Sequence, residues 1–148
     1  MIKLKKLISD IADYKLRELT NKKKGKIYCL RFSNEYVCIN DIILLQTNIH
    51  SSIFKIDECT TTLHKMYQRL AEKDYIKKCV LIQRLNNQVL LYNEGNHIAT
   101  FDSEYLKYFE NPLKLEYYAI DYKSPIMVKD KFNNKAFIMP IITNSNNT

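Results

Sequence analysis

The chain has no tryptophan, and it has only two glycines and three prolines among its 148 residues. With so few glycines, most turns must use Asn, Asp and Ser, which tolerate left-handed backbone conformations better than other residue types. No apolar run approaches the ~18 residues of a transmembrane helix, and no apolar stretch typical of a secretory signal follows the N-terminal lysines. We therefore expect a cytoplasmic protein with no membrane partner.

Recurring catalytic and metal-binding motifs are also missing. There is no glycine-rich phosphate loop, no H-E-x-x-H and no G-x-S-x-G. The cysteines and histidines lack the paired spacing of a zinc site: Cys29, Cys38, Cys59, Cys79, His50, His64 and His97. The sequence therefore predicts no enzyme, no cofactor and no metal. An active site whose residues meet only in the folded chain would leave no such motif.

The pattern of apolar residues predicts a single α+β domain with mainly antiparallel strands. Spacings of three and four residues indicate helices, and strict alternation indicates strands. The expected helices are 5–19, 61–77 and a short one that begins at Asp102 or Ser103, where either side chain can cap it. The expected strands are 2–4, 26–32, 35–40, 42–49, 79–85, 89–92, 97–101, 115–120, 125–129 and 136–142. We expect this domain to span residues 1–143, followed by a polar tail, 144–148.

Two structural details follow from this pattern. A two-residue turn at Ser33 and Asn34 would place Cys29 directly opposite Cys38 in a hairpin. The apolar residues of the short third helix and the last strands should share one core: Phe101, Leu106, Phe109, Ile126, Val128, Phe137 and Met139.

Positive charge is concentrated at the N-terminus. Residues 1–26 contain three acids, Asp10, Asp13 and Glu18, and nine basic residues: Lys3, Lys5, Lys6, Lys15, Arg17, Lys22, Lys23, Lys24 and Lys26. Such a segment can bind nucleic-acid phosphates through counterion release, without sequence preference. A solvated helix face followed by a loop explains the same charges equally well.

The last third of the chain resembles one known family. Phe101, Asp102, Tyr105, Leu106, Ser124, Pro125, Met139 and Pro140 match the pattern of the last half-domain of the bacterial DNA polymerase sliding clamp. In that pattern a Phe-Asn-x-x-Tyr-Leu helix leads to a Ser-Pro strand and a closing Met-Pro-hydrophobic strand. The resemblance implies a domain of two βαβββ units whose helices face DNA. It also implies that the C-terminal residues, here Met139, Pro140 and Ile141, contribute to a groove for partner peptides.

The chain departs from the family at two points. The helix expected around residues 61–77 has no counterpart in a clamp repeat, and the family's closing arginine is absent. Two functions remain open. One is a clamp-like, DNA-associated accessory protein, encoded by a phage or mobile element, that forms homo-oligomers or works beside a replication complex. The other is a small protein-interaction module or inhibitor of a host factor that uses the same fold without DNA binding, with tyrosines such as Tyr105, Tyr108, Tyr117 and Tyr118 as anchors.

Overall fold

The computed structural model describes residues 2–19, 27–32, 34–47, 61–75, 77–83 and 86–142. The helices are α1 (Leu4–Leu19), α3 (Thr61–Ala71) and two 3₁₀ helices, η1 (Ser103–Tyr108) and η2 (Pro112–Lys114). The strands are β1 (Ile27–Phe32), β2 (Asn34–Ile39), β3 (Ile43–Gln46), β4 (Lys78–Gln83), β5 (Gln88–Asn93), β6 (Asn96–Asp102), β7 (Glu116–Tyr118), β8 (Ile126–Lys129) and β9 (Lys135–Ile138).

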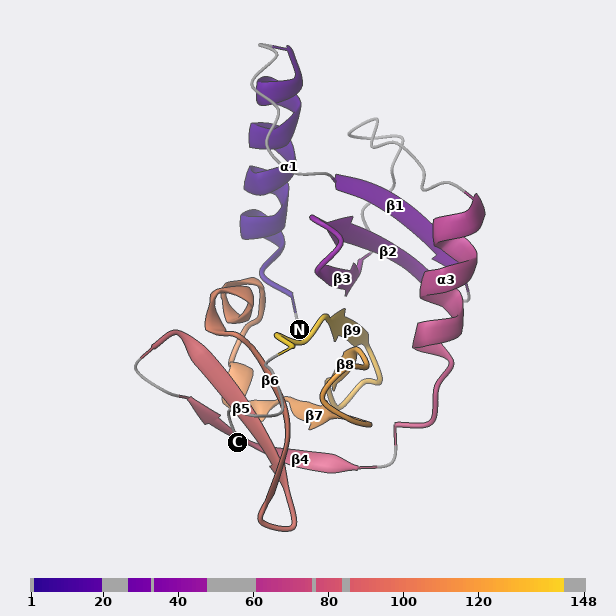
Figure 1. The fold of residues 1–148 in the computed structure, drawn as a ribbon. Helices are drawn as coiled ribbons and strands as arrows, with labels where there is room; N and C mark the ends of the chain where they lie inside the picture. Colours follow the sequence, from indigo (N-terminus) through magenta and orange to yellow (C-terminus); the bar gives the residue numbers. More distant parts are fainter. Residues whose placement is uncertain are drawn as a thin grey trace.

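All the described strands belong to one sheet, in the order β1-β2-β3-β9-β8-β7-β4-β5-β6, with antiparallel neighbours throughout. The predicted α+β class is therefore confirmed. Figure 1 shows the sheet curling strongly between the β1–β2 end and the β5–β6 end. The curl brings the segment after β9 back to β6, where the Ile141 backbone N–H donates to the Thr100 carbonyl at 2.8 Å.

The order of the strands contains a repeat. The first helix, α1, is followed by the antiparallel strands β1, β2 and β3, and the later helix η1 is followed by β7, β8 and β9. The final strands of the two groups, β3 and β9, pair with each other, so the six strands run symmetrically outward from this junction. The two helices also meet, because Ile2, just before α1, forms a bridge with Phe109, just after η1.

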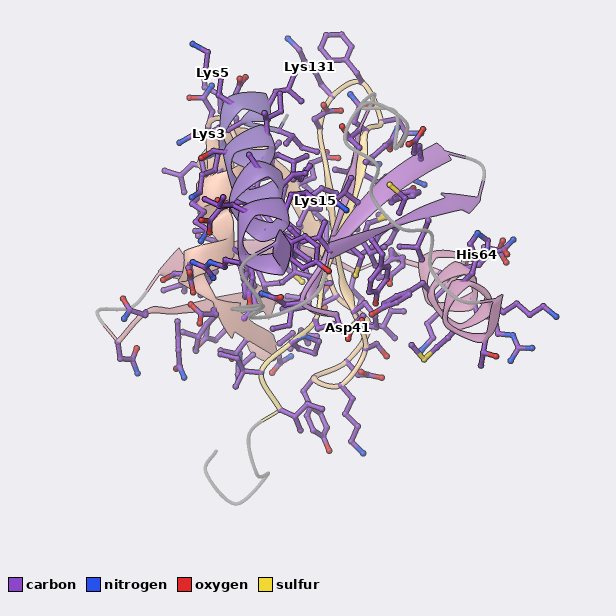
Figure 2. All side chains as sticks on the ribbon, turned by 90° about the horizontal axis from the view of Figure 1, so that it is seen from above. Lys3, Lys5, Lys15, Asp41, His64 and Lys131 are labelled. Atoms are coloured by element: carbon purple, nitrogen blue, oxygen red, sulfur yellow. The ribbon has the colours of Figure 1, made fainter. Side chains whose placement is uncertain are left out.

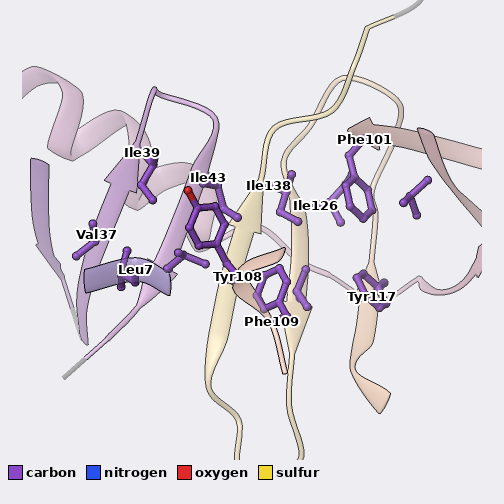
Figure 3. Close-up of a cluster of buried hydrophobic side chains, with 14 of the residues drawn as sticks. Leu7, Val37, Ile39, Ile43, Phe101, Tyr108, Phe109, Tyr117, Ile126 and Ile138 are labelled. Carbon is purple, nitrogen blue, oxygen red and sulfur yellow. The ribbon is translucent and has the colours of Figure 1, made fainter. Parts of the chain in front are cut away.

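The sheet is apolar on both faces. One row of paired residues runs across it through Cys29, Val37, Leu45, Ala136, Val128 and Tyr117. These residues form the larger core together with Leu7 and Ile11 of α1 and Tyr108 and Phe109 at the end of η1 (Figure 3). The adjacent row, on the opposite face, forms a second core with Tyr67 of α3. The helices α1 and α3 therefore cover opposite faces of the sheet.

This two-faced burial corrects the predicted single core. Phe101, Phe109, Ile126 and Val128 lie in the larger core, and Leu106 packs against it. Phe137 lies in the second core, and Met139 packs against that core instead. Phe137 and Val128 belong to opposite faces because Phe137 pairs with Met127, one residue from Val128.

The predicted hairpin register is wrong by one residue. Phe32 pairs with Asn34, so Cys29 faces Val37 and Cys38 faces Tyr28. The two cysteines therefore lie on opposite faces of the sheet, and neither forms a disulfide. The sequence could not determine this register because residues 27–30 and 36–39 are buried on both faces, so alternation does not distinguish an inner from an outer side.

Several predicted boundaries also change. Ile2 forms only an isolated bridge, the second helix ends at Ala71, and the third helix is a 3₁₀ helix. The last strand ends at Ile138. The backbone N–H of Met139 donates to the Ile42 carbonyl, and Pro140 has no backbone N–H that could continue the strand pairing. The meander β4–β5–β6 is confirmed, and its second turn places both Glu94 and Gly95 in the left-handed region, as a type I′ two-residue hairpin turn requires.

Candidate nucleic-acid interface

Helix α1 carries most of the predicted basic segment that lies within the described residues. Its side chains Leu7, Ile11 and Tyr14 follow helical spacing and are buried in the larger core. The opposite side of α1 is solvent-exposed and includes Leu16, which is 60% exposed. The buried face fixes the direction in which the described charged side chains of α1 point.

The cations of α1 do not share one face. Lys3 and Lys5 are exposed near its beginning, and Lys15 projects from the other side in the view along the helix (Figure 2). Lys6 is paired with Asp10 and Arg17 with Asp13, each at 3.0 Å across one helical turn. Exposed pairs of this kind add little stability, but they offset two of the five positive charges of residues 3–17. Lys22, Lys23, Lys24 and Lys26 lie outside the described residues.

A surface groove of about 280 Å³ lies beside α1. Asp10, Asp13 and Arg17 line it from α1, and Lys107 and Tyr108 line it from η1. Charges of both signs therefore face the groove, and each acid on the α1 side already has a basic partner. The groove is thus less suited to a polyanion than the exposed lysines at the beginning of α1 are.

Asp10 joins α1 to η1. Its carboxylate accepts a hydrogen bond from the Tyr108 hydroxyl at 2.5 Å and one from Lys6 Nζ at 3.0 Å. Burial raises the pKa of Asp10, but these two hydrogen bonds and the charges of Lys6 and Lys107 outweigh it, so the pKa lies below its ordinary value. Burial and the bond to Asp10 raise the pKa of Tyr108, which therefore remains a proton donor.

This contact predicts a specific loss of stability in acid. The pKa of Asp10 is lower in the folded chain than in the unfolded one. Its contribution to the free energy of unfolding is therefore complete at pH values above its pKa in the unfolded chain, about 3.9. That contribution disappears as the pH falls through the pKa of Asp10 in the folded chain. Urea unfolding of Asp10→Asn between about pH 2 and pH 7 should show a weaker decline below about pH 4 than the parent protein shows. Asp13→Asn, which changes only an exposed pair with Arg17, is the matched control; equal acid profiles for Asp10→Asn and the parent would contradict the assignment.

The predicted peptide-binding segment, Met139 to Ile141, lies between the beginning of β3 and strand β6. Met139 is half-buried against the second core, and its N–H donates to the Ile42 carbonyl at 2.7 Å. Ile141 donates to Thr100, and Pro140 between them is half-buried. These backbone bonds give the segment a structural role in holding the end of β9 against β3 and β6.

A second polar cluster lies under α3. Tyr67 donates to Asp41 Oδ1 at 3.0 Å, and Tyr28 donates to the same oxygen. Cys38 lies beside Tyr67, and burial raises the pKa of this thiol to about 11. A thiol with such a pKa stays protonated near neutrality and is a poor nucleophile, so this cluster attaches α3 to the β2–β3 turn rather than forming a reactive site.

The sequence contained a signal for part of this arrangement. Lys6 and Asp10, like Asp13 and Arg17, stand four residues apart, the spacing that pairs charges on a helix. Asp10 with Tyr108, and Asp41 with Tyr67, are distant in the sequence and left no local pattern. Two of the expected tyrosine anchors, Tyr108 and Tyr117, are buried in the larger core.

Comparisons with protein-family models, curated proteins and solved structures give no match for this chain. Within the described ranges, no three His, Cys, Asp or Glu side chains gather as metal ligands would. No described helix has the length and apolar character needed to cross a membrane.

Proposed function

We propose that this protein is a non-catalytic, DNA-associated accessory protein with the architecture of a sliding-clamp domain. The supporting observation is the repeated arrangement of a helix followed by three antiparallel strands, with β3 and β9 paired at the centre. The sequence resemblance implies a domain of two βαβββ units, and each of these units contains a helix followed by three strands. Helix α3 has no place in that scheme.

The two helices of the repeat, α1 and η1, lie on the same face of the sheet. Helix α1 and η1 both pack on the larger core, and Ile2 and Phe109 link their ends. In the clamp arrangement this is the DNA-facing side. Lys3 and Lys5 are exposed there and form no ion pair within the described part of the chain, so they are available to phosphates.

The expected mode of binding is electrostatic and independent of sequence. Lysines supply point charges, and α1 presents none of the paired polar side chains that read base edges. Affinity should therefore fall steeply with salt and differ little between DNA sequences. A clamp-like ring would require several copies of this chain, so homo-oligomers are part of the proposal.

Anisotropy titrations of short labelled duplexes over a range of salt concentrations test this function. Lys3→Ala with Lys5→Ala, and separately Lys22, Lys23 and Lys24 to Ala, should weaken binding equally for all duplexes. The salt slope should fall by about 0.9 for each phosphate that a removed lysine would have neutralised. Lys65→Ala with Arg69→Ala, exposed cations on α3 at the opposite face, is the matched control and should change little.

Two results would reject DNA association. One is a parent protein that binds neither duplex nor single-stranded DNA at low salt, where electrostatic affinity is greatest. The other is an α3 control that weakens binding as much as the α1 variant. The second candidate, a protein-interaction module, would then be preferred; the observation that favours it is a set of large apolar side chains on the surface, among them Val80, Leu113 and Phe132.

A further inference from the structure

The apolar row on the second face of the sheet is covered over only part of its length. The row passes through Tyr28, Cys38, Leu44, Phe137, Met127 and Tyr118, and α3 packs on its β1 end through Tyr67. Beyond Tyr118 the row reaches β4, where Lys78, Val80 and Ile82 share this face. Val80 is 68% exposed and Ile82 46% exposed.

The same part of β4 has an open edge. Over residues 80–83, β4 pairs with β5 on one side, but β7 on the other side pairs only with Lys78 and Cys79. The Ala119 N–H donates to the Lys77 carbonyl at 3.3 Å, so odd-numbered residues of β4 direct their backbone groups toward β7. Leu81 and Gln83 therefore direct theirs beyond the end of β7, where no described strand pairs with them.

The surroundings of this edge are basic. Lys78 lies next to Val80 on the exposed face, and both Lys78 and Lys129 contact the single carboxylate of Glu116, at 3.2 and 3.7 Å. Lys77 and Lys114 nearby in the chain are exposed as well. Val80–Gln83 itself contains no proline and no charge, which are two of the features that protect an exposed edge strand from pairing.

We propose that the second half of β4 accepts an extended segment of a partner protein as an added strand. The backbone groups of Leu81 and Gln83 require a partner in β conformation, and Val80 and Ile82 require apolar side chains at alternate positions of that segment. The lysines around Glu116 favour an acidic residue in it. A second copy of this chain fits less well, because each copy carries a formal net charge of +7 and would bring the same lysines to the contact.

This site gives the protein-interaction function a specific location, on the face opposite α1, so it is independent of DNA binding. Amide exchange measured by NMR tests the open edge without any ligand. In dilute protein, the Leu81 amide should exchange at close to the rate of an unfolded chain, while the Val80 and Ile82 amides, which face β5, should be protected. A strongly protected Leu81 amide in the monomer would overturn the proposal.

Peptide titrations test the occupant. The probe is a synthetic peptide of alternating valine and threonine with a glutamate at each end; a version with lysine at each end and a version with central proline are the comparisons. Only the glutamate peptide should bind well and protect the Leu81 amide. Ile82→Lys should weaken its binding by about tenfold or more, and Val80→Thr, which keeps strand propensity, should weaken it in the same direction.

Met66→Lys is the matched control, because Met66 on α3 is 44% exposed, close to the value for Ile82. It should leave peptide binding unchanged. Equal binding of the lysine peptide, or no binding of the glutamate peptide, would reject an acidic partner segment. If protection of the Leu81 amide rises with protein concentration and the solution mass is that of a dimer, the occupant is a second copy of this chain. That result would reject an acidic partner segment. DNA titrations of the same variants should show no change, which separates failure here from failure of DNA association.

Discussion

Replacing Phe109 by alanine should lower the free energy of unfolding by about 3–5 kcal/mol, the usual loss for a buried phenylalanine. Phe109 is completely buried in the larger core, directly after η1, and it also forms the bridge to Ile2. The ring therefore fills space at the point where the two unit helices meet the sheet. Since single domains are stable by only about 5–15 kcal/mol, urea unfolding should show a midpoint shift that is readily measured.

Leu106→Ala provides the comparison for Phe109→Ala. The sequence pattern predicts a loss of about 2–5 kcal/mol at Leu106, as for a fully buried leucine. Leu106 packs against the larger core but is only half-buried, so the structure favours a smaller loss of about 1–2 kcal/mol. A Phe109→Ala loss no larger than that of Leu106→Ala would show that η1 is not anchored through Phe109.

The second large effect is expected at Tyr67, which attaches α3 to the sheet. Tyr67→Ala should cost about 3–5 kcal/mol, since a buried aromatic ring is removed. Tyr67→Phe keeps the ring and removes only the hydroxyl that donates to Asp41, so it should cost about 1 kcal/mol. Thermal and urea unfolding of both variants separate the contribution of packing from that of the hydrogen bond.

Met66→Ala is the control for the Tyr67 variants. Met66 precedes Tyr67 on the same helix but is exposed, so its replacement should change stability by no more than about 0.5 kcal/mol. If Tyr67→Ala were equally mild, α3 would contribute little to the stability of the sheet. If Tyr67→Phe were as damaging as Tyr67→Ala, the hydroxyl cluster, and not the ring, would hold the helix.

Local signals predicted much of the fold. The meander β4–β5–β6 follows from alternation and from the Asn-rich and Gly-containing turns, and Asp102 caps η1 by accepting from the Glu104 N–H at 2.9 Å. Helix α1 follows from the spacing of Leu7, Ile11 and Tyr14. In each case the information lies within a few residues of the element that it specifies.

The errors arose where the deciding contacts are distant in the sequence. The β1–β2 register depends on α1 covering one face and α3 the other, which no property of residues 27–39 could indicate. The candidate interface shows the same limit. The sequence placed nine cations at the N-terminus, but whether Lys6 and Arg17 are available depends on Asp10 and Asp13, and the position of Asp10 depends on Tyr108.

The pairing of β3 with β9 has a consequence for how the chain reaches its native state. Leu45 and Ala136 are neighbours in the sheet although most of the chain separates them. The three-stranded groups β1–β2–β3 and β4–β5–β6 can form early from local contacts. The free edges of β3 and β4 stay unpaired until β9, β8 and β7 form between them. Such non-local closure slows folding. During synthesis on the ribosome, the first two groups of strands therefore keep apolar edges exposed until the segment with β7, β8 and β9 has been made.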